Sequence, residues 1–244
     1  MKRPVPGNSP VTVVSSTRLN EPTFWGRTHL GRSLMRIPQE LRPRLVLRRE
    51  NQGRWGLSQV YNEALESTTD AAALLFVHDD VYLHDWFIVQ RVMEAISVYD
   101  VVGIAGSVNP DLRQPSWGLA FDANLRPTGW QPALKRSGAV GHSDSADPDL
   151  SVYGDIPQTC QLLDGVLLAV NAQVVRATGV RFDETFRFHL YDLDFCRSAT
   201  KAGLTLGTWP ISVTHKSRGN FDNDEFRDAA TRYLSKWDTS PASG

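Results

Sequence analysis

Hydrophobic positions in the first 105 residues alternate between short continuous runs and stripes at helical spacing. A continuous run bounded by polar residues predicts a buried strand, and apolar residues three and four positions apart predict one face of a helix. The predicted strands cover 11–15, 45–48, 71–77 and 101–105, and the predicted helices cover 56–66 and 84–98. Strands that alternate with helices pair in parallel through right-handed crossovers, so this pattern predicts an open α/β sheet.

The pattern breaks between about residues 109 and 157, where Pro, Gly, Ser and Asp replace the apolar runs. Such a long insertion is typical of a lid or a substrate loop, although a surface excursion without function has the same composition. Two apolar segments then flank Asp164-Gly165, and Asn171 can cap the helix that follows. The remaining predicted elements are a helix over 192–202 ending at Gly203, a strand over 204–209 and a helix over 221–237.

These elements predict a single domain over 10–238 with a mostly parallel central sheet flanked by helices. A nucleotide-binding half would cover about 10–108, the insertion about 109–157, and an acceptor half about 158–238. Residues 1–9 and 239–244 read as a flexible amino terminus and a flexible tail.

Composition limits the class of protein. With 244 residues, 41% hydrophobic and 22% charged, the chain can bury a large core. A formal net charge of -1 gives no general attraction to nucleic acid, although arginines gather around 42–54. No run approaches the roughly 20 apolar residues of a membrane span, and the first residues lack a signal peptide's apolar region. We expect a cytoplasmic protein; residues 86–88, Trp-Phe-Ile, could also place it at the inner face of the membrane.

The strongest chemical signal is His78-Asp79-Asp80, which directly follows the apolar run 74–77. Ligands of open α/β sheets gather at the carboxyl ends of such strands. Two adjacent carboxylates repel each other and are costly to desolvate, so a bound cation or full exposure to water explains them. A solvated turn is the alternative for this segment.

Two further segments carry acidic residues at element ends. Tyr191-Asp192-Leu193-Asp194 opens a predicted helix, where carboxylates also complement the helix dipole. Asp164-Gly165 could line a sugar pocket, and a simple hairpin turn explains the same two letters. Trp117, Trp130 and Trp209 could stack on sugar rings, while packing in the core is the other use of tryptophan.

The order of four segments resembles the bacterial family-2-like nucleotide-sugar glycosyltransferases of GT-A fold. They are the polar loop after the first strand, the strand-end His-Asp-Asp, the Leu163–Val166 turn and the acidic start of the 192–202 helix. The resemblance covers roughly residues 10 to 237. It implies a nucleoside-diphosphate sugar donor, a glycan or glycolipid acceptor, and Mn²⁺ or Mg²⁺ as cofactor.

The resemblance also implies site residues. Asp80 would bind the metal with His78 and a downstream histidine, His215, and Asp192 would deprotonate the acceptor hydroxyl. His78 and Tyr191 depart from the usual pattern, which more often has an aspartate and a glutamate there. The donor and nucleotide site would contain Ser15, Ser16, Thr17, Arg18, Asn62, Asp79, Asp164 and Gly165, and the acceptor site Trp117, Trp130 and Asp194. Asp194 could instead cap the helix or orient a neighbouring residue.

The sequence therefore predicts a metal-dependent glycosyltransferase of surface polysaccharide synthesis that inverts the anomeric configuration. Two alternatives stay open. A metal-dependent nucleotide-sugar phosphohydrolase would also need a nucleotide pocket and clustered acids, but no Gly-x-x-x-x-Gly-Lys loop or second acidic cluster is present. A carbohydrate-binding module that has lost activity would fit the departures at His78 and Tyr191.

Overall fold

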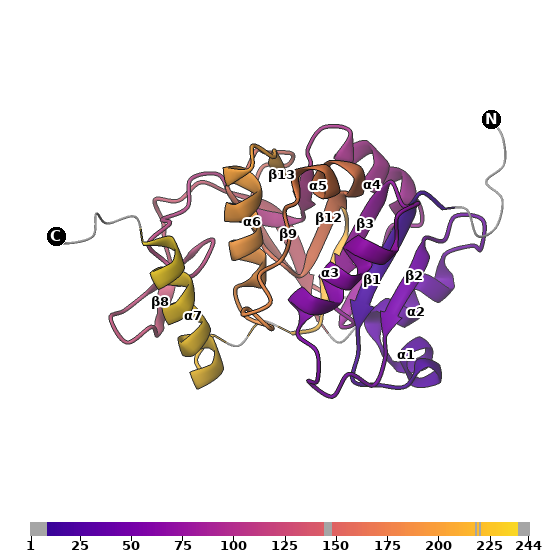
Figure 1. The fold of residues 1–244 in the computed structure, drawn as a ribbon, viewed down its shortest axis with the longest axis horizontal. Coiled ribbons are helices and arrows are strands. Elements are labelled where there is room, and N and C mark those ends of the chain that lie inside the picture. Colours follow the sequence, from indigo (N-terminus) through magenta and orange to yellow (C-terminus); the bar gives the residue numbers. More distant parts are fainter. Residues whose placement is uncertain (1–8, 144–147, 218, 220, 239–244) are drawn as a thin grey trace.

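A computed structural model describes residues 9–143, 148–217, 219 and 221–238 of the chain. Within these residues, seven helices surround two six-stranded sheets and a separate hairpin (Figure 1). The helices are α1 (Glu21–Arg27), α2 (His29–Arg36), α3 (Leu57–Ser67), α4 (Ile88–Ile96), α5 (Ala172–Thr178), α6 (Tyr191–Lys201) and α7 (Asp224–Trp237). The buried side chains form one hydrophobic core, as a single domain requires.

The central sheet has the order β13-β5-β12-β3-β1-β2. Its strands are β1 (Val11–Ser16), β2 (Arg44–Arg48), β3 (Ala73–Val77), β5 (Val101–Gly103), β12 (Leu167–Asn171) and β13 (Leu206–Thr208). Every residue of β3 is buried, as expected for a strand covered on both faces. The β1, β2 and β3 strands pair in parallel, which confirms the crossovers predicted for the first half of the chain.

The β12 strand departs from the predicted parallel pairing. The β12 strand lies between β3 and β5 and is antiparallel to both. The β12 strand comes much later in the chain than β3 and β5, yet it separates them in the sheet. The sheet is α/β and mixed, with its parallel pairs in β2-β1-β3 and β5-β13.

The second sheet corrects the prediction of an irregular insertion. Four strands form between residues 119 and 154: β7 (Leu119–Phe121), β8 (Pro127–Trp130), β9 (Arg136–His142) and β10 (Asp149–Gly154). The β7 and β8 strands make the hairpin, while β9 and β10 join the second sheet. Its other strands are β4 (Val81–Leu83), β6 (Ala105–Ser107), β11 (Leu162–Leu163) and β14 (Val213–His215). Several of these strands are very short, so they give no periodic signal in the sequence.

The predicted helix starts and ends agree with local capping. Asn171 accepts a hydrogen bond from the Val174 amide and caps α5, and Gly203, at φ 85°, follows the end of α6. The two short helices α1 and α2 had no counterpart in the prediction. Asn20 and Thr28 cap them, and each is only about two turns long, so their apolar stripes are too brief to recognise.

Two predictions concern segments at the surface or the ends. The flexible segments expected at 1–9 and 239–244 lie outside the described residues, apart from Ser9. Trp86 and Phe87 are 55% and 53% exposed, whereas Ile88 is buried in the core. None of the helices in the described part of the chain is long and apolar enough to cross a bilayer.

Candidate functional site

The candidate site lies where the carboxyl end of β3, the end of β14 and the start of α6 converge. A cavity of about 190 Å³ is lined by residues from all three elements. His78 follows β3, His215 ends β14, and Asp192 lies in the first turn of α6. Gly165 comes from the turn between β11 and β12, and Trp117 from the segment before β7. Chain segments more than 100 residues apart therefore supply one cavity.

Three side chains in this region could hold a metal ion. One possible ligand atom each from His78, Asp80 and His215 lie within 4.8 Å of one another. His215 Nε2 lies 3.2 Å from Asp80 Oδ1. The β4 and β14 strands pair in antiparallel fashion with His215 opposite Val81, which brings the end of β14 beside Asp80. Two imidazoles and one carboxylate suit Mn²⁺ better than Mg²⁺, which prefers oxygen ligands.

The protonation of these residues fits a cation. Burial lowers the pKa of His78, and the charge of Asp80 opposes this only in part, so a neutral imidazole is favoured. Burial alone would raise the pKa of Asp80, but the hydrogen bond and charge of His215 outweigh it and hold the pKa below its ordinary value. Metal binding requires a neutral imidazole and an ionised carboxylate, and His78 and Asp80 meet these two requirements.

Asp192 lines the same cavity, and backbone amides fix its carboxylate. Its Oδ2 accepts a hydrogen bond of 2.7 Å from the Gly165 N–H, and its Oδ1 accepts one of 2.9 Å from the Leu193 N–H. A Cβ added to Gly165 would lie 2.5 Å from the Tyr191 hydroxyl and 2.7 Å from Asp192 Cβ. Glycine is therefore required at 165 for this close approach.

The pKa of Asp192 is raised to about 7, first by burial and then by the negative charge of Asp164, despite the backbone hydrogen bonds that lower it. A carboxylate with a pKa near the working pH is half ionised there and can both accept and release a proton. Among the acidic groups of the cavity, Asp192 is thus suited to act as a general base.

Asp164 has a different environment although it lines the same cavity. Its Oδ1 accepts a hydrogen bond of 2.9 Å from the Val166 amide, and its Oδ2 accepts one of 2.9 Å from Trp117 Nε1. Both carboxylate oxygens therefore have protein partners. Asp164 fixes the turn and the indole of Trp117, and its charge acts on Asp192.

An aromatic wall closes the cavity on the side of the insertion. The rings of Trp117, Trp130 and Tyr153 lie 5.0 to 5.4 Å apart, centroid to centroid. Trp117 is buried and Trp130 is 46% exposed. Trp117 and Trp130 were expected in the acceptor site, and both line the cavity with Tyr153, which the sequence did not single out. Trp209 is not among the lining residues.

The predicted nucleotide loop lies next to Asp79. The β1 and β3 strands are parallel neighbours, so the loop at 15–18 and the 78–80 segment share one edge of the sheet. Burial raises the pKa of Asp79, and a hydrogen bond from Thr17 together with the charge of Arg18 opposes the rise. The Ser16 hydroxyl accepts a hydrogen bond from Asn51. Arg18 is exposed, whereas Ser15 is fully buried in β1.

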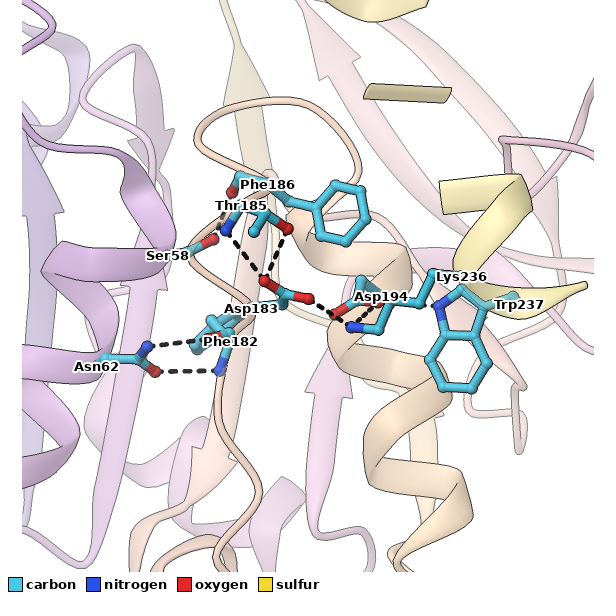
Figure 2. A network of polar contacts seen from close by, with 9 residues as sticks. All are labelled: Ser58, Asn62, Phe182, Asp183, Thr185, Phe186, Asp194, Lys236 and Trp237. Carbon is cyan, nitrogen blue, oxygen red and sulfur yellow. Dashed lines mark hydrogen bonds and ion pairs between the residues drawn. The ribbon is translucent and has the colours of Figure 1, made fainter. Parts of the chain in front are cut away.

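Several predicted site residues do not line the cavity: Asp79, Asp80, residues 15–18, Asn62 and Asp194. The last two hold the 182–187 loop. Asn62 on α3 exchanges hydrogen bonds of 2.9 and 3.0 Å with the backbone of Phe182 (Figure 2). The carboxylate of Asp194 is fully buried and lies 2.7 Å from Lys236 Nζ, and its Oδ1 also accepts a bond from Trp237 Nε1. We call these contacts, with Ser58, Asp183 and Thr185, the loop clamp.

The roles expected for Asp194 and Asn62 stay predictions, although both side chains take part in the loop clamp. Asp194 was expected beside the acceptor and Asn62 beside the nucleotide, yet in this structure neither side chain lines the cavity. Asp192 and Asp194 are two positions apart on a helix, so their side chains point about 200° apart around its axis. One faces the cavity and the other faces α7.

Comparison with known proteins shows the fold. The sequence matches no family model and no curated protein. Among solved structures, GalNAc-T7 with UDP, GalNAc and Mn²⁺ is similar, with a TM-score of 0.57 at 11% identity, over 93% of this chain and 48% of that chain. The chain thus spans about half the length of GalNAc-T7. The TM-score above 0.5 shows that this chain has the GT-A glycosyltransferase fold.

Two other structures are similar at a TM-score of 0.46. One is the mannosyltransferase PcManGT from Pyrobaculum calidifontis in complex with GDP-Man and Mn²⁺, at 14% identity over 89% of this chain and 60% of that chain. The other is A197 from STIV, at 10% identity over 85% of both chains. These two scores lie below 0.5 and do not enter the fold assignment.

Proposed function

We propose that this chain is a Mn²⁺-dependent glycosyltransferase that moves a sugar from a nucleoside-diphosphate sugar to a hydroxyl of a glycan or glycolipid acceptor. One observation supports this most strongly: two of the three possible metal ligands, His78 and His215, line the same cavity of a GT-A fold as Asp192, whose pKa is raised to about 7. A fold alone does not fix a function, so the proposal depends on these residues.

The donor would lie along the edge formed by β1 and β3. His78, Asp80 and His215 would hold the cation, which when bound would neutralise negative charge on the donor diphosphate. Asp79 and Thr17 lie next to this group and offer oxygens to the hydroxyls of a ribose or a sugar. The exposed Arg18 adds a positive charge for the phosphates.

Asp192 would remove the proton from the acceptor hydroxyl as that oxygen attacks the anomeric carbon. The bond between this carbon and the diphosphate oxygen breaks at the same time, and the nucleoside diphosphate leaves with the electron pair. We expect inversion because a single displacement needs no enzyme nucleophile on the donor. Burial and the negative charge of Asp164 raise the pKa of Asp192 to about 7, which suits Asp192 to accept this proton.

The acceptor would lie against the aromatic wall. The face of an indole packs well against the apolar face of a pyranose, and the exposed Trp130 offers such a surface. A saccharide acceptor fits this wall, and a role in the synthesis of a surface polysaccharide is part of the proposal.

A thermal-shift screen tests the donor half of the proposal. UDP, GDP, dTDP and CMP are each added with Mn²⁺, with Mg²⁺ and without a cation, because a ligand that binds the native state raises the Tm. We expect one nucleotide to raise the Tm strongly with Mn²⁺ and weakly without it. Asp80→Ala should abolish the Mn²⁺-dependent part, whereas Asp70→Ala, an exposed carboxylate paired with Arg44, should leave it unchanged.

A transfer assay with the identified nucleotide's sugars separates the rival functions. A phosphohydrolase would release nucleotide at full rate without any acceptor, and a binding module would bind saccharide without a cation or a nucleotide. Absence of any nucleotide-dependent shift, with saccharide binding intact, would contradict the proposal.

A further inference from the structure

Tyr191 connects two parts of the site that are far apart in the sequence. Its hydroxyl lies 2.9 Å from His78 Nε2 and 2.7 Å from the carbonyl oxygen of Gly165. The side chain is almost fully buried, so water does not compete for either contact. The roles proposed so far for the metal ligands and for Asp192 do not explain why the Tyr191 hydroxyl makes these two hydrogen bonds.

Counting protons at the Tyr191 hydroxyl determines which atoms donate. A carbonyl oxygen only accepts, so the single hydroxyl proton of Tyr191 goes to Gly165. The hydroxyl oxygen is then an acceptor toward His78, and His78 Nε2 must carry a proton. In a neutral imidazole the lone pair therefore lies on Nδ1, which becomes the only ring atom that can bind a cation.

Both rings of this pair are held in place by other aromatic residues. Phe188 stacks on the His78 ring with centroids 6.1 Å apart and planes inclined by 23°. Tyr61 and Phe182 pack on Tyr191 with centroids 5.7 and 6.1 Å away. Tyr61 and Phe182 are buried, so displacement of the Tyr191 ring would require the core to repack, whereas Phe188 is 57% exposed.

Gly165 extends the chain of hydrogen bonds to the base. Its carbonyl accepts from Tyr191, and its own N–H donates to Asp192 Oδ2 at 2.7 Å. Hydrogen bonds from His78 to Tyr191, from Tyr191 to Gly165 and from Gly165 to Asp192 thus connect a possible metal ligand with the candidate base.

We infer that Tyr191 is a positioning residue that holds His78 in the tautomer which binds a divalent cation through Nδ1, and that couples this ligand to the turn that orients Asp192. The inference rests on the proposed function for the identity of the cation and the base. Partners that orient a metal-binding imidazole commonly change metal affinity 10- to 100-fold when they are removed.

The tautomer is tested first, on the wild-type protein without metal. Two-bond ¹H–¹⁵N correlation spectra distinguish an Nε2–H from an Nδ1–H imidazole, and the six histidines make assignment by a His78→Gln variant practical. We expect His78 to be in the Nε2–H form, and a mixture of both forms in Tyr191→Phe. An Nδ1–H form of His78 in the wild type would overturn the inference.

Metal affinity is tested next, by titration calorimetry with Mn²⁺ alone. We expect Tyr191→Phe to bind Mn²⁺ at least about 10-fold more weakly than the wild type. The matched control Tyr153→Phe removes a hydroxyl from the same cavity without touching His78, and it should keep the wild-type affinity. Equal affinities of Tyr191→Phe and the wild type would overturn the inference.

The two measurements also separate this inference from the proposed function. A wild type that does not bind Mn²⁺ would overturn both. A wild type that binds Mn²⁺ and transfers sugar, but whose His78 is in the Nδ1–H form, would overturn only the role of Tyr191.

Discussion

The two sides of the first turn of α6 carry the same residue type in opposite environments. Asp192 faces the cavity, near the charge of Asp164 and without a cationic side chain among its hydrogen-bond partners. Asp194 faces the loop clamp, where Lys236 and Trp237 bond to it. Burial raises the pKa of both carboxyls, but only Asp194 has a lysine to oppose the rise.

The different environments of Asp192 and Asp194 indicate different roles, one in catalysis and the other in stability. Breaking a buried ion pair between a carboxylate and a lysine costs stability. Keeping a buried carboxylate ionised without a cationic partner also costs free energy, so its pKa rises. We therefore expect changes at the cavity to reduce turnover at little cost in stability, and changes at the loop clamp to do the reverse.

The largest effect should come from Asp192→Asn. An amide cannot accept the acceptor's proton, so turnover should fall roughly 10²- to 10⁴-fold while Mn²⁺ and nucleotide binding stay near wild type. Turnover of the wild type should increase as the pH rises through about 7, because Asp192 must be ionised to act as the base. Initial rates from pH 5 to 9, with nucleotide binding measured in parallel, check both. An equal loss of binding would contradict the role of Asp192.

Lys236→Ala should have the largest effect on stability. It removes the cationic partner of Asp194 and Asp183 and leaves the buried Asp194 carboxylate with the indole N–H of Trp237 but without a cation. We expect a loss of about 3 kcal/mol in the free energy of unfolding, at the low end for a buried pair because Lys236 is partly exposed. Urea unfolding measures this. Lys201→Ala, at an exposed lysine of α6, is the control and should change stability little.

Asp192 should also make the stability of the wild type depend on pH. Its folded pKa of about 7 lies above the ordinary value of 3.8, so the folded state binds more protons and the free energy of unfolding falls as pH rises from about 4 to 7. Asn does not titrate. The stability of Asp192→Asn relative to wild type should increase by about 4 kcal/mol between pH 4 and pH 8.

Urea unfolding of both proteins at the two pH values measures this difference and cancels any fixed cost of the substitution. Asp70→Asn is the control, because the hydrogen bond from Arg44 lowers the pKa of Asp70 and the relative stability should not increase with pH. A relative stability of Asp192→Asn that does not change with pH would mean that Asp192 is not the buried, uncompensated acid described above.

A smaller effect is expected from Gly165→Ala. The added methyl group must displace the Tyr191 hydroxyl or the Asp192 carboxylate, so turnover should fall on the order of 10-fold through misplacement of the base. Gly26→Ala is a matched control, since a Cβ at Gly26 meets nothing within 4 Å. Steady-state kinetics on both variants decide the point. Wild-type turnover in Gly165→Ala would show that the turn does not position Asp192.

Much of the central sheet could be predicted from local patterns. The β1, β3 and α3 elements lie within a few residues of their predicted ranges, because burial of one strand or helix face leaves its period in the sequence. The order of the strands was not predictable in this way. The insertion of β12 between β3 and β5 depends on which strands pair across the sheet, and no local period records that choice.

The sequence by itself determined where polar groups interrupt buried strands, and thus that His78, Asp79 and Asp80 stand at a strand end. Only the tertiary structure decided that His215 meets Asp80, that Tyr191 bonds to His78 from 113 residues away, and that Asp194 belongs to the loop clamp. Local patterns fix which face of an element is buried, because hydrophobic burial follows the period of the backbone. Contacts between side chains of distant elements depend on how those elements pack, and this is set by the whole core at once.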